Sequence, residues 1–273
     1  MSMYKDVNQA VWNSGSALTL ARVAAGRSIL QNALAPLNDR TANLNTQDMQ
    51  DIVTAGSTIF NPGAEISKQY KDGYVGRQGG FDYMESTLWP AHTRGAANGS
   101  YVCNTSTGIT SGTATITLSA GSGSSAIGDV FTIDGVFRVH PETKVNTGVL
   151  QQFVVTAAGT TSQAVSPTPI TSGARQNITI VGAGASKAVI FLGTASGDDG
   201  TSLLYHKDAF AFATADLVMP KGVDFAAREV FDGISMRIVR AYDINNDNLP
   251  CRIDVLYGYK TLRASQAVRL HHN

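Results

Sequence analysis

Two short segments of the chain carry residues at spacings that could bind a phosphate or a calcium ion. In GAGASK (182–187), glycines precede a lysine, and phosphate-binding loops use backbone amides and a lysine in this way. The Walker pattern GxxxxGK[ST] also requires a second glycine before the lysine and a Ser or Thr after it, and both are absent. Lys187 also stands where GxGxxG requires its third glycine. We therefore predict a turn between strands.

The segment DINNDN (243–248) places Asp243, Asn245 and Asp247 at alternate positions, as in a calcium loop, and Asp254 falls at the twelfth position. Asn248 stands where the calcium loop requires glycine, and Asp254 replaces the bidentate glutamate. The flanking residues alternate as strands do, so the segment is predicted to be an ordinary polar turn. GDDG (197–200), with the carboxylate pair Asp198 and Asp199, is likewise predicted to be a solvated turn.

No catalytic or zinc-binding pattern surrounds the histidines, serines or cysteines. HExxH, GxSxG and paired Cys/His spacings are all absent, and the terminal pair His271 and His272 would bind a metal only adventitiously. Cys103 and Cys251 are predicted to be buried free thiols of a protein made in a reducing cytoplasm. We expect no enzymatic activity, no cofactor and no metal. The histidines are His92, His140, His206, His271 and His272.

Composition favours a protein whose surface is covered by other subunits. Lys and Arg number 21, as do Asp and Glu, so the net charge is zero and gives no electrostatic reason to expect a nucleic-acid or anionic-membrane partner. Charged residues make up only 15% of the chain, against about 25% in soluble domains. No apolar run reaches the ~18 residues that a membrane span needs.

The residue composition changes twice along the chain, near residues 100 and 200. Residues 1–100 are expected to be mainly helical and loop-rich, with one helix at 14–35, another starting at Asn45 or Thr46, and an ordered loop or short strands across the Gly- and aromatic-rich residues 61–100. Residues 101–200 alternate in runs such as TATITLS and LQQFVVTA and predict an antiparallel β-barrel or sandwich. Residues 201–273 resemble the first part. We therefore expect the middle block to be inserted into one discontinuous domain.

The segment 233–262 is predicted to be a long β-hairpin with arms of about ten residues, each about 33 Å long. Ile234, Met236 and Ile238 alternate with Ser235, Arg237 and Val239. Across the turn, Ile253, Val255 and Tyr257 alternate with Arg252, Asp254 and Leu256. The apolar face is expected to pack inward and the other face to be polar. Candidate contacts with other subunits on this polar face are Arg237, Arg252 and Asp254.

Four segments resemble the coat protein family of phage P22, whose members have the Hong Kong 97-type capsid fold. They are LQNALAPLNDRTANLNTQDMQDIV (30–53), IFNPGAEISKQYKDGYVGRQGGFDYMESTLWPAHTRG (59–95), GDVFTIDGVFRVHPETKVNTGVLQQFVVTA (128–157) and 206–270, which begins HKDAFAFATADLVMP. The resemblance implies an α+β shell domain, with axial and peripheral parts and an inserted β-domain. It also implies a subunit of an icosahedral capsid, assembled in the host cytoplasm as pentamers and hexamers with a scaffolding protein and a portal, around double-stranded DNA bound without sequence specificity.

The resemblance also predicts features that this chain has no room for: an N-terminal arm, an extended loop and most of a long spine helix ahead of residues 14–35. Within the middle block, Glu142 and Lys144 in PETKVNTG (141–148) are candidate contacts between capsomers, and the alternative is a solvated turn. The other hypothesis for the whole chain is a β-rich glycan-binding or glycan-cleaving protein. It would need exposed rings in the middle block, where the aromatic residues are Tyr101, Phe131, Phe137, Phe153 and Phe191.

Overall fold

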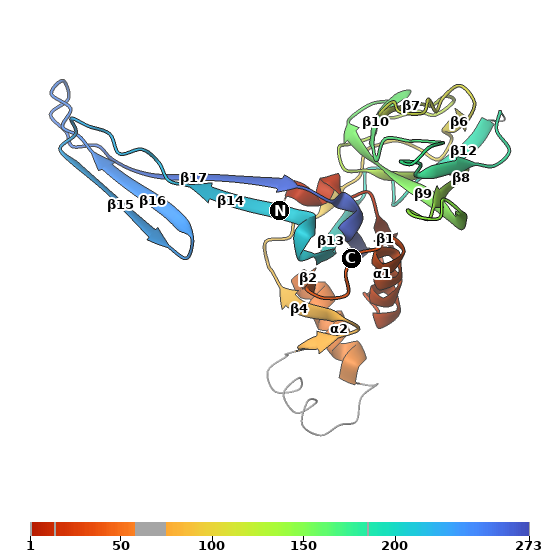
Figure 1. Cartoon of the computed structure of the whole chain (residues 1–273), viewed down its shortest axis with the longest axis horizontal. Helices are drawn as coiled ribbons and strands as arrows, with labels where there is room; N and C mark the ends of the chain where they lie inside the picture. The colour runs from red at the N-terminus through yellow and green to blue at the C-terminus, as the bar shows by residue number, and fades with distance from the viewer. Residues whose placement is uncertain (1, 14, 58–74, 185, 273) are drawn as a thin grey trace. The chain divides into compact units, whose positions relative to one another are not determined.

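The computed structural model describes residues 2–13, 15–57, 75–184 and 186–272. The chain forms two compact units, one of Met1–Ala209 with Arg263–Asn273 and the other of Phe210–Leu262. Figure 1 shows the helices and two of the sheets in the first unit and a separate sheet in the second. No helix among the described residues is long and apolar enough to cross a membrane.

In the described part of the first unit there are two α-helices, α1 (Leu20–Asn32) and α2 (Thr46–Ser57). α1 is shorter at both ends than the predicted helix at 14–35. It packs tightly at Gly26, where a Cβ atom would lie 2.4 Å from Cδ1 of Leu204. α2 starts where the sequence predicts, because the Asn45 side chain accepts a hydrogen bond from the Asp48 amide at 2.7 Å.

Both helices belong with a seven-stranded sheet, which we call the base sheet. The strand order is β1-β18-β13-β2-β4-β3, and β5 pairs with β13. Its core includes Val23 and Leu30 of α1 with Leu204 and Leu270 of the sheet. The strands are β1 (Ala10–Trp12), β2 (Arg40–Leu44), β3 (Arg77–Gln78), β4 (Phe81–Glu85), β5 (His92–Thr93), β13 (Asp198–His206) and β18 (Ala267–His272).

The base sheet corrects the expectation that residues 1–100 are mainly helical. Among the described residues of this part, five short strands lie beside the two helices, and those at 77–93 are among the short strands expected of the Gly-rich segment. Part of that segment, residues 61–74, lies outside the described residues. β1 lies parallel to β18, with Trp12 opposite His271. Local propensity missed β1 because its partner is at the other end of the chain.

Residues 101–193 form a second seven-stranded sheet, which we call the β-block. The order is β6-β12-β8-β9-β10-β7, with β11 on β8, and all the pairs are antiparallel. The predicted antiparallel strands of the middle block are confirmed. They are β6 (Val102–Asn104), β7 (Thr115–Thr117), β8 (Val130–Val139), β9 (Asn146–Ala157), β10 (Ser162–Ser166), β11 (Ile178–Ile180) and β12 (Ser186–Phe191).

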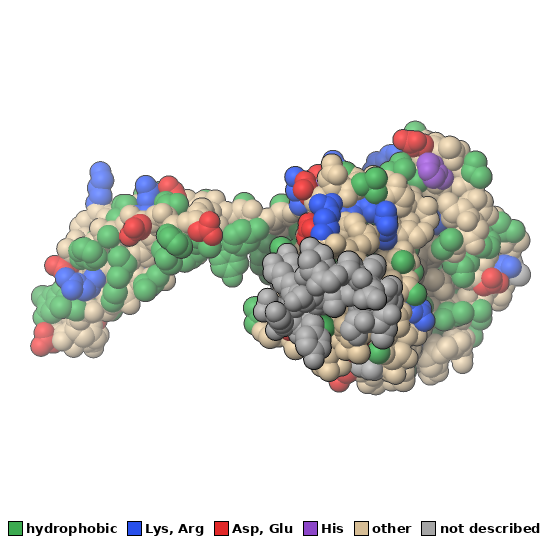
Figure 2. All heavy atoms as spheres, turned by 90° about the horizontal axis from the view of Figure 1, so that it is seen from below, with side chains coloured by type: hydrophobic (Ala, Val, Ile, Leu, Met, Phe, Trp, Pro, Cys, Tyr) green, Lys and Arg blue, Asp and Glu red, His purple; other side chains and the backbone are tan. Residues whose placement is uncertain are grey.

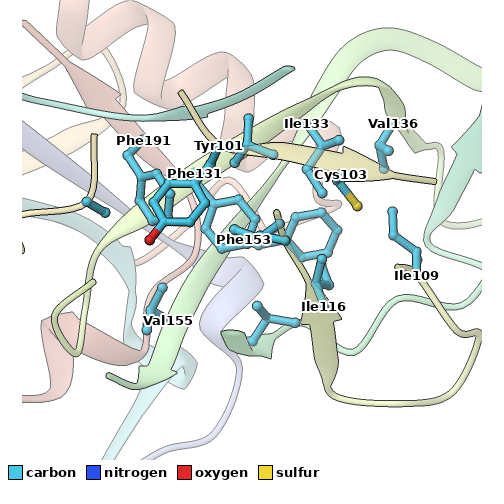
Figure 3. Packing of buried hydrophobic residues seen from close by; sticks show 14 of the residues in the cluster. Tyr101, Cys103, Ile109, Ile116, Phe131, Ile133, Val136, Phe153, Val155 and Phe191 are labelled. Carbon is cyan, nitrogen blue, oxygen red and sulfur yellow. The ribbon is translucent and has the colours of Figure 1, made fainter. Parts of the chain in front are cut away.

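The β-block has its own apolar core (Figure 3), in which Phe131 packs against Phe153 and Phe191 at ring-centroid distances of 5.8 and 5.1 Å. Cys103 is buried in this core, as predicted. GAGASK joins β11 to β12 through two glycines with positive φ, Gly182 and Gly184. Its lysine, Lys187, lies in β12, with Nζ 3.9 Å from Oδ2 of Asp134.

The second unit, which we call the β-arm, is a four-stranded antiparallel sheet of order β14-β17-β16-β15. The predicted hairpin is present as β16 and β17, but β16 has seven residues instead of ten, and β14 and β15 extend it into a sheet. Cys251 is exposed here, contrary to prediction. The strands are β14 (Phe210–Ala215), β15 (Phe225–Phe231), β16 (Ile234–Arg240) and β17 (Cys251–Thr261).

The predicted polar turn between β16 and β17 is confirmed. Oδ1 of Asp243 accepts a hydrogen bond from the Asn245 amide at 3.0 Å, and Asp243 bridges to Asn248. No group of three or more metal-ligating side chains occurs in the described part of the chain. The prediction for GDDG was wrong, because Asp198 and Asp199 lie in β13 and Asp199 is buried.

Candidate subunit-contact surface on the beta-arm

The strand register of the β-arm gathers its large apolar side chains on one face. Residues directly opposite each other in an antiparallel pair point to the same side of the sheet. The pairs include Phe212 with Tyr259, Met236 with Val255, and Phe231 with Ile234. We call this side the apolar face. Its members are Phe212, Phe225, Phe231, Ile234, Met236, Ile253, Val255, Tyr257 and Tyr259.

The apolar face is open to solvent in this chain. Phe231 is 78% exposed, Ile253 67% and Phe212 61%. The rings of Phe212 and Tyr257 are stacked, with centroids 6.1 Å apart, and Tyr257 is stacked in turn on Tyr259. Figure 2 shows hydrophobic side chains following one another along the β-arm, at the left of the view. A contiguous exposed patch of this kind marks an interaction site in a soluble protein.

The opposite face is partly covered by the chain itself. Arg237 forms an ion pair with Asp254, in which Nη2 at 2.5 Å and Nε at 3.2 Å both donate to Oδ2, and its Nη1 donates to the Val218 carbonyl at 2.5 Å. Ser235, on the same side, is buried. The segment between β14 and β15 therefore covers the part of this face around Arg237. The predicted division into an apolar and a polar face is confirmed. The prediction that the apolar face packs inward was wrong, because this face is exposed and the chain covers part of the other one.

Arg237, Arg252 and Asp254 lie together, as one charged cluster. Nε of Arg252 is 2.8 Å from Oδ1 of Asp254, so the carboxylate has a guanidinium on each oxygen. The hydrogen bond from Arg237 lowers the pKa of Asp254, and Arg252 lowers it further. The Arg252 side chain is 72% exposed, whereas the side chains of Arg237 and Asp254 are 13% and 19% exposed. Of the three side chains, that of Arg252 is the most exposed and therefore the most available for contact with a partner.

Glu142 and Lys144 lie in the other unit, in the turn between β8 and β9. Nζ of Lys144 donates to the backbone carbonyls of Pro141, in its own turn, and of Gln176, in the segment before β11, so this ammonium is used within the β-block. The backbone of Lys144 has a φ of 57°, which adds strain for a residue with a side chain. Glu142 is exposed and makes no salt bridge within the described ranges.

Sequence reasoning missed the contribution of β14 and β15 to the apolar face. Phe212 lies in FAFATA, where every second residue from Phe210 to Thr214 points to the side of Tyr257 and Tyr259. This alternation was a usable signal. The fact that β14 pairs with β17 could not be read from it, because strand pairing is set by tertiary contacts.

The rings required by the glycan hypothesis do not form a binding platform. In the β-block, Tyr101, Phe131, Phe153 and Phe191 are buried side chains of the apolar core, and Phe137 is half-buried. A sugar platform requires exposed rings. The middle block therefore gives no support to a glycan site.

Comparison with known families identifies the chain's relatives. The family model described as P22 coat protein, gene protein 5, matches residues 14–270. The chain belongs to the P22 coat protein family. Its members are structural proteins of bacteriophage capsids, and the predicted resemblance is confirmed.

A solved structure from Mycobacterium phage Che8 is similar over 98% of this chain and 54% of that chain, at 11% sequence identity and a TM-score of 0.42. The chain thus spans about half the length of that structure. No curated protein matches the sequence.

Proposed function

We propose that this chain is a major capsid subunit with a Hong Kong 97-type fold, which assembles as pentamers and hexamers into the icosahedral shell of a tailed double-stranded DNA phage. In this proposal residues 1–100 and 201–273 build the shell domain and 101–200 are its inserted β-domain. The observation that carries the proposal is the apolar face of the β-arm, which is solvent-exposed in a chain whose family forms shells.

The partner proposed for this face is a neighbouring copy of the subunit. The face is apolar, whereas DNA and an anionic membrane attract positive charge, and the chain as a whole has no net charge. Burying a large, half-exposed apolar side chain stabilises an interface by about 1 kcal/mol. Nine such side chains lie on this one face, so a shell contact can be built from many modest contributions.

Charged contacts are proposed at the edges of these surfaces. Arg252 is the member of the arm cluster that can reach a neighbour, while Arg237 and Asp254 hold each other in place. In the β-block, Glu142 and Lys144 are proposed as contacts between capsomers. A scaffolding protein, a portal and packaged DNA without sequence specificity complete the set of partners. Assembly would take place in the host cytoplasm and end in the virion.

The proposal is tested by measuring assembly of the purified chain, alone and with its scaffolding protein, by sedimentation velocity and electron microscopy. Replacing Tyr257 by Ser is expected to weaken association about tenfold, because it removes an aromatic contact worth roughly 1–2 kcal/mol. The matched control is Val230→Ser, which changes an apolar residue that is 56% exposed on the opposite side of the sheet.

The control is expected to associate as the parent does. A parent chain that stays monomeric in the presence of the scaffolding protein would refute the capsid proposal. Equal loss of association in the two variants would refute the assignment of the apolar face.

A further inference from the structure

The base sheet and the β-block meet through a polar layer, which we call the joint. Each has its own large apolar core. Between them, among the residues that the structure describes, Ala10, Val130 and Val154 form a small buried cluster, with Trp12 and Leu192 packed beside it. An interface that is poor in apolar contacts resembles one between domains that can move relative to each other.

Several side-chain hydrogen bonds cross the joint. The Gln152 side chain accepts from the Ala10 amide at 2.7 Å and donates to the Ala10 carbonyl at 2.9 Å. NH1 of Arg269 donates to the Gly128 carbonyl at 2.8 Å. The ring of His92 lies between the Tyr4 hydroxyl at 3.3 Å and Oδ1 of Asp129 at 3.2 Å.

His271 lies in the base sheet against Trp12 and His92, which in turn contact the β-block. It is in β18 and fully buried, and its ring is stacked on Trp12 with centroids 3.9 Å apart. The His92 ring is 5.5 Å away. Neither ring nitrogen of His271 has a hydrogen-bond partner among the described protein groups. The positively charged side chain of Arg269 lies on the same face of β18 as His271, two residues earlier in the strand.

We propose that the joint is an acid-sensitive latch, in which protonation of His271 releases the β-block from the base sheet. An imidazolium here would be buried without a carboxylate bonded to it, close to Arg269 and His92. Burial of an unpaired charge is costly, so the charged form favours a conformation that exposes the ring. The titratable and charged groups that face the joint are Tyr4, Asp6, His92, Arg94, Asp129, Asp199, Arg269 and His271.

The direction of the pH dependence follows from linkage. Burial lowers the pKa of His271 well below 6.5, and the nearby Arg269, His92 and His272 lower it further. In an open joint the ring meets water and regains an ordinary pKa of about 6.5. Below that pH the open form therefore binds one more proton than the closed form. The equilibrium constant for opening then rises up to about tenfold for each unit of pH.

Opening of the joint leaves both apolar cores intact, so the β-block can change position without either part unfolding. This inference concerns the single chain and does not depend on its assembly.

The test is native-state hydrogen exchange of the purified, unassembled chain between neutral pH and pH about 5. The informative amides are those of Ala10 and Gly95, which bond across the joint to Gln152 and Asp129. Their protection factors are expected to fall about tenfold per pH unit below about 6.5. The reference amides are those of Phe131 and Phe153, which pair inside the β-block and are expected to keep their protection.

Two variants distinguish the effect of protonating His271 from that of protonating its neighbour His272. His271→Gln is expected to remove the pH dependence at Ala10 and Gly95. His272→Gln is the matched control, because His272 points to the other face of the sheet, toward Arg22 and Asp51, and it is expected to leave the dependence unchanged. Persistence of the dependence in His271→Gln would overturn the proposal, as would its loss in both variants.

A second measurement keeps the test decisive if His271→Gln does not fold. The chain has two tryptophans, Trp12 and Trp89. In a Trp89→Phe chain, Trp12 alone reports on the joint. Its emission is expected to shift to longer wavelength below pH about 6.5 while far-UV circular dichroism stays constant. Emission that does not change across this range would refute the latch.

Discussion

Replacing Asp48 by Asn is expected to stabilise the first unit at neutral pH. Asp48 is fully buried at the start of α2, and its Oδ2 accepts a hydrogen bond from the Ser202 hydroxyl. Its other carboxylate oxygen, Oδ1, has no hydrogen-bond partner in the described part of the chain. Burial raises the pKa of Asp48 from 3.8 to about 6, although the bond from Ser202 acts in the opposite direction.

The size of the effect follows from this pKa. A folded-state value above the unfolded one means that Asp48 favours folding only when protonated. This stability is fully present below about pH 3.8 and is lost as pH rises through about 6. The difference of about two units corresponds to about 3 kcal/mol at pH 7.5. Asn has the same shape without the charge. Asp48→Asn is therefore expected to raise the free energy of unfolding by about 1–3 kcal/mol at pH 7.5 and by almost nothing at pH about 4.

The assay is urea unfolding of the parent and Asp48→Asn at both pH values. Tryptophan emission reports on the first unit, because Trp12 lies in β1 and the indole nitrogen of Trp89 donates to Asn43 of β2 at 3.0 Å. The control is Asp51→Asn, a change to a neighbouring carboxylate that is less buried. If Asp48→Asn destabilises the chain at pH 7.5, or its effect is equal at the two pH values, the reasoning is wrong.

Two further predictions concern the same unit. Gly26→Ala is expected to lower the free energy of unfolding by about 1–3 kcal/mol, because the new methyl would lie 2.4 Å from Cδ1 of the buried Leu204. Thermal unfolding of the parent and the variant measures this difference. Gly99→Ala, where no atom lies within 4 Å of the added Cβ, is its control, and equal losses in the two variants would contradict the packing argument. The second prediction concerns His272, whose pKa burial lowers from 6.5 to about 4. Its neutral ring contributes stability that is present above pH 6.5 and lost as pH falls toward 4, about 3 kcal/mol in all. In urea titrations, His272→Gln is therefore expected to lose less stability on acidification than the parent, and an unchanged pH profile would refute this.

Local patterns in the sequence were enough to predict several elements. The start of α2 followed from Asn45 as a capping residue, the antiparallel strands of the β-block from alternation, and the turn at 243–248 from its Asp and Asn residues. The two faces of the hairpin could also be assigned, because alternation along a strand fixes which residues share a side. Each of these features depends on residues close together in the chain.

The sequence by itself thus determined the family, the β-rich middle block and the composition of the two faces of the β-arm. Only the tertiary structure decided which face of the arm is covered, because that depends on where the segment between β14 and β15 lies. It also decided that Asp199, His271 and His272 are buried, although the GDDG motif and the terminal histidines are polar. Residues 10–12 and 269–271 are at opposite ends of the chain and become neighbours only when β1 pairs with β18. Burial and pKa arise from such distant pairings, because they depend on which groups replace water around a side chain.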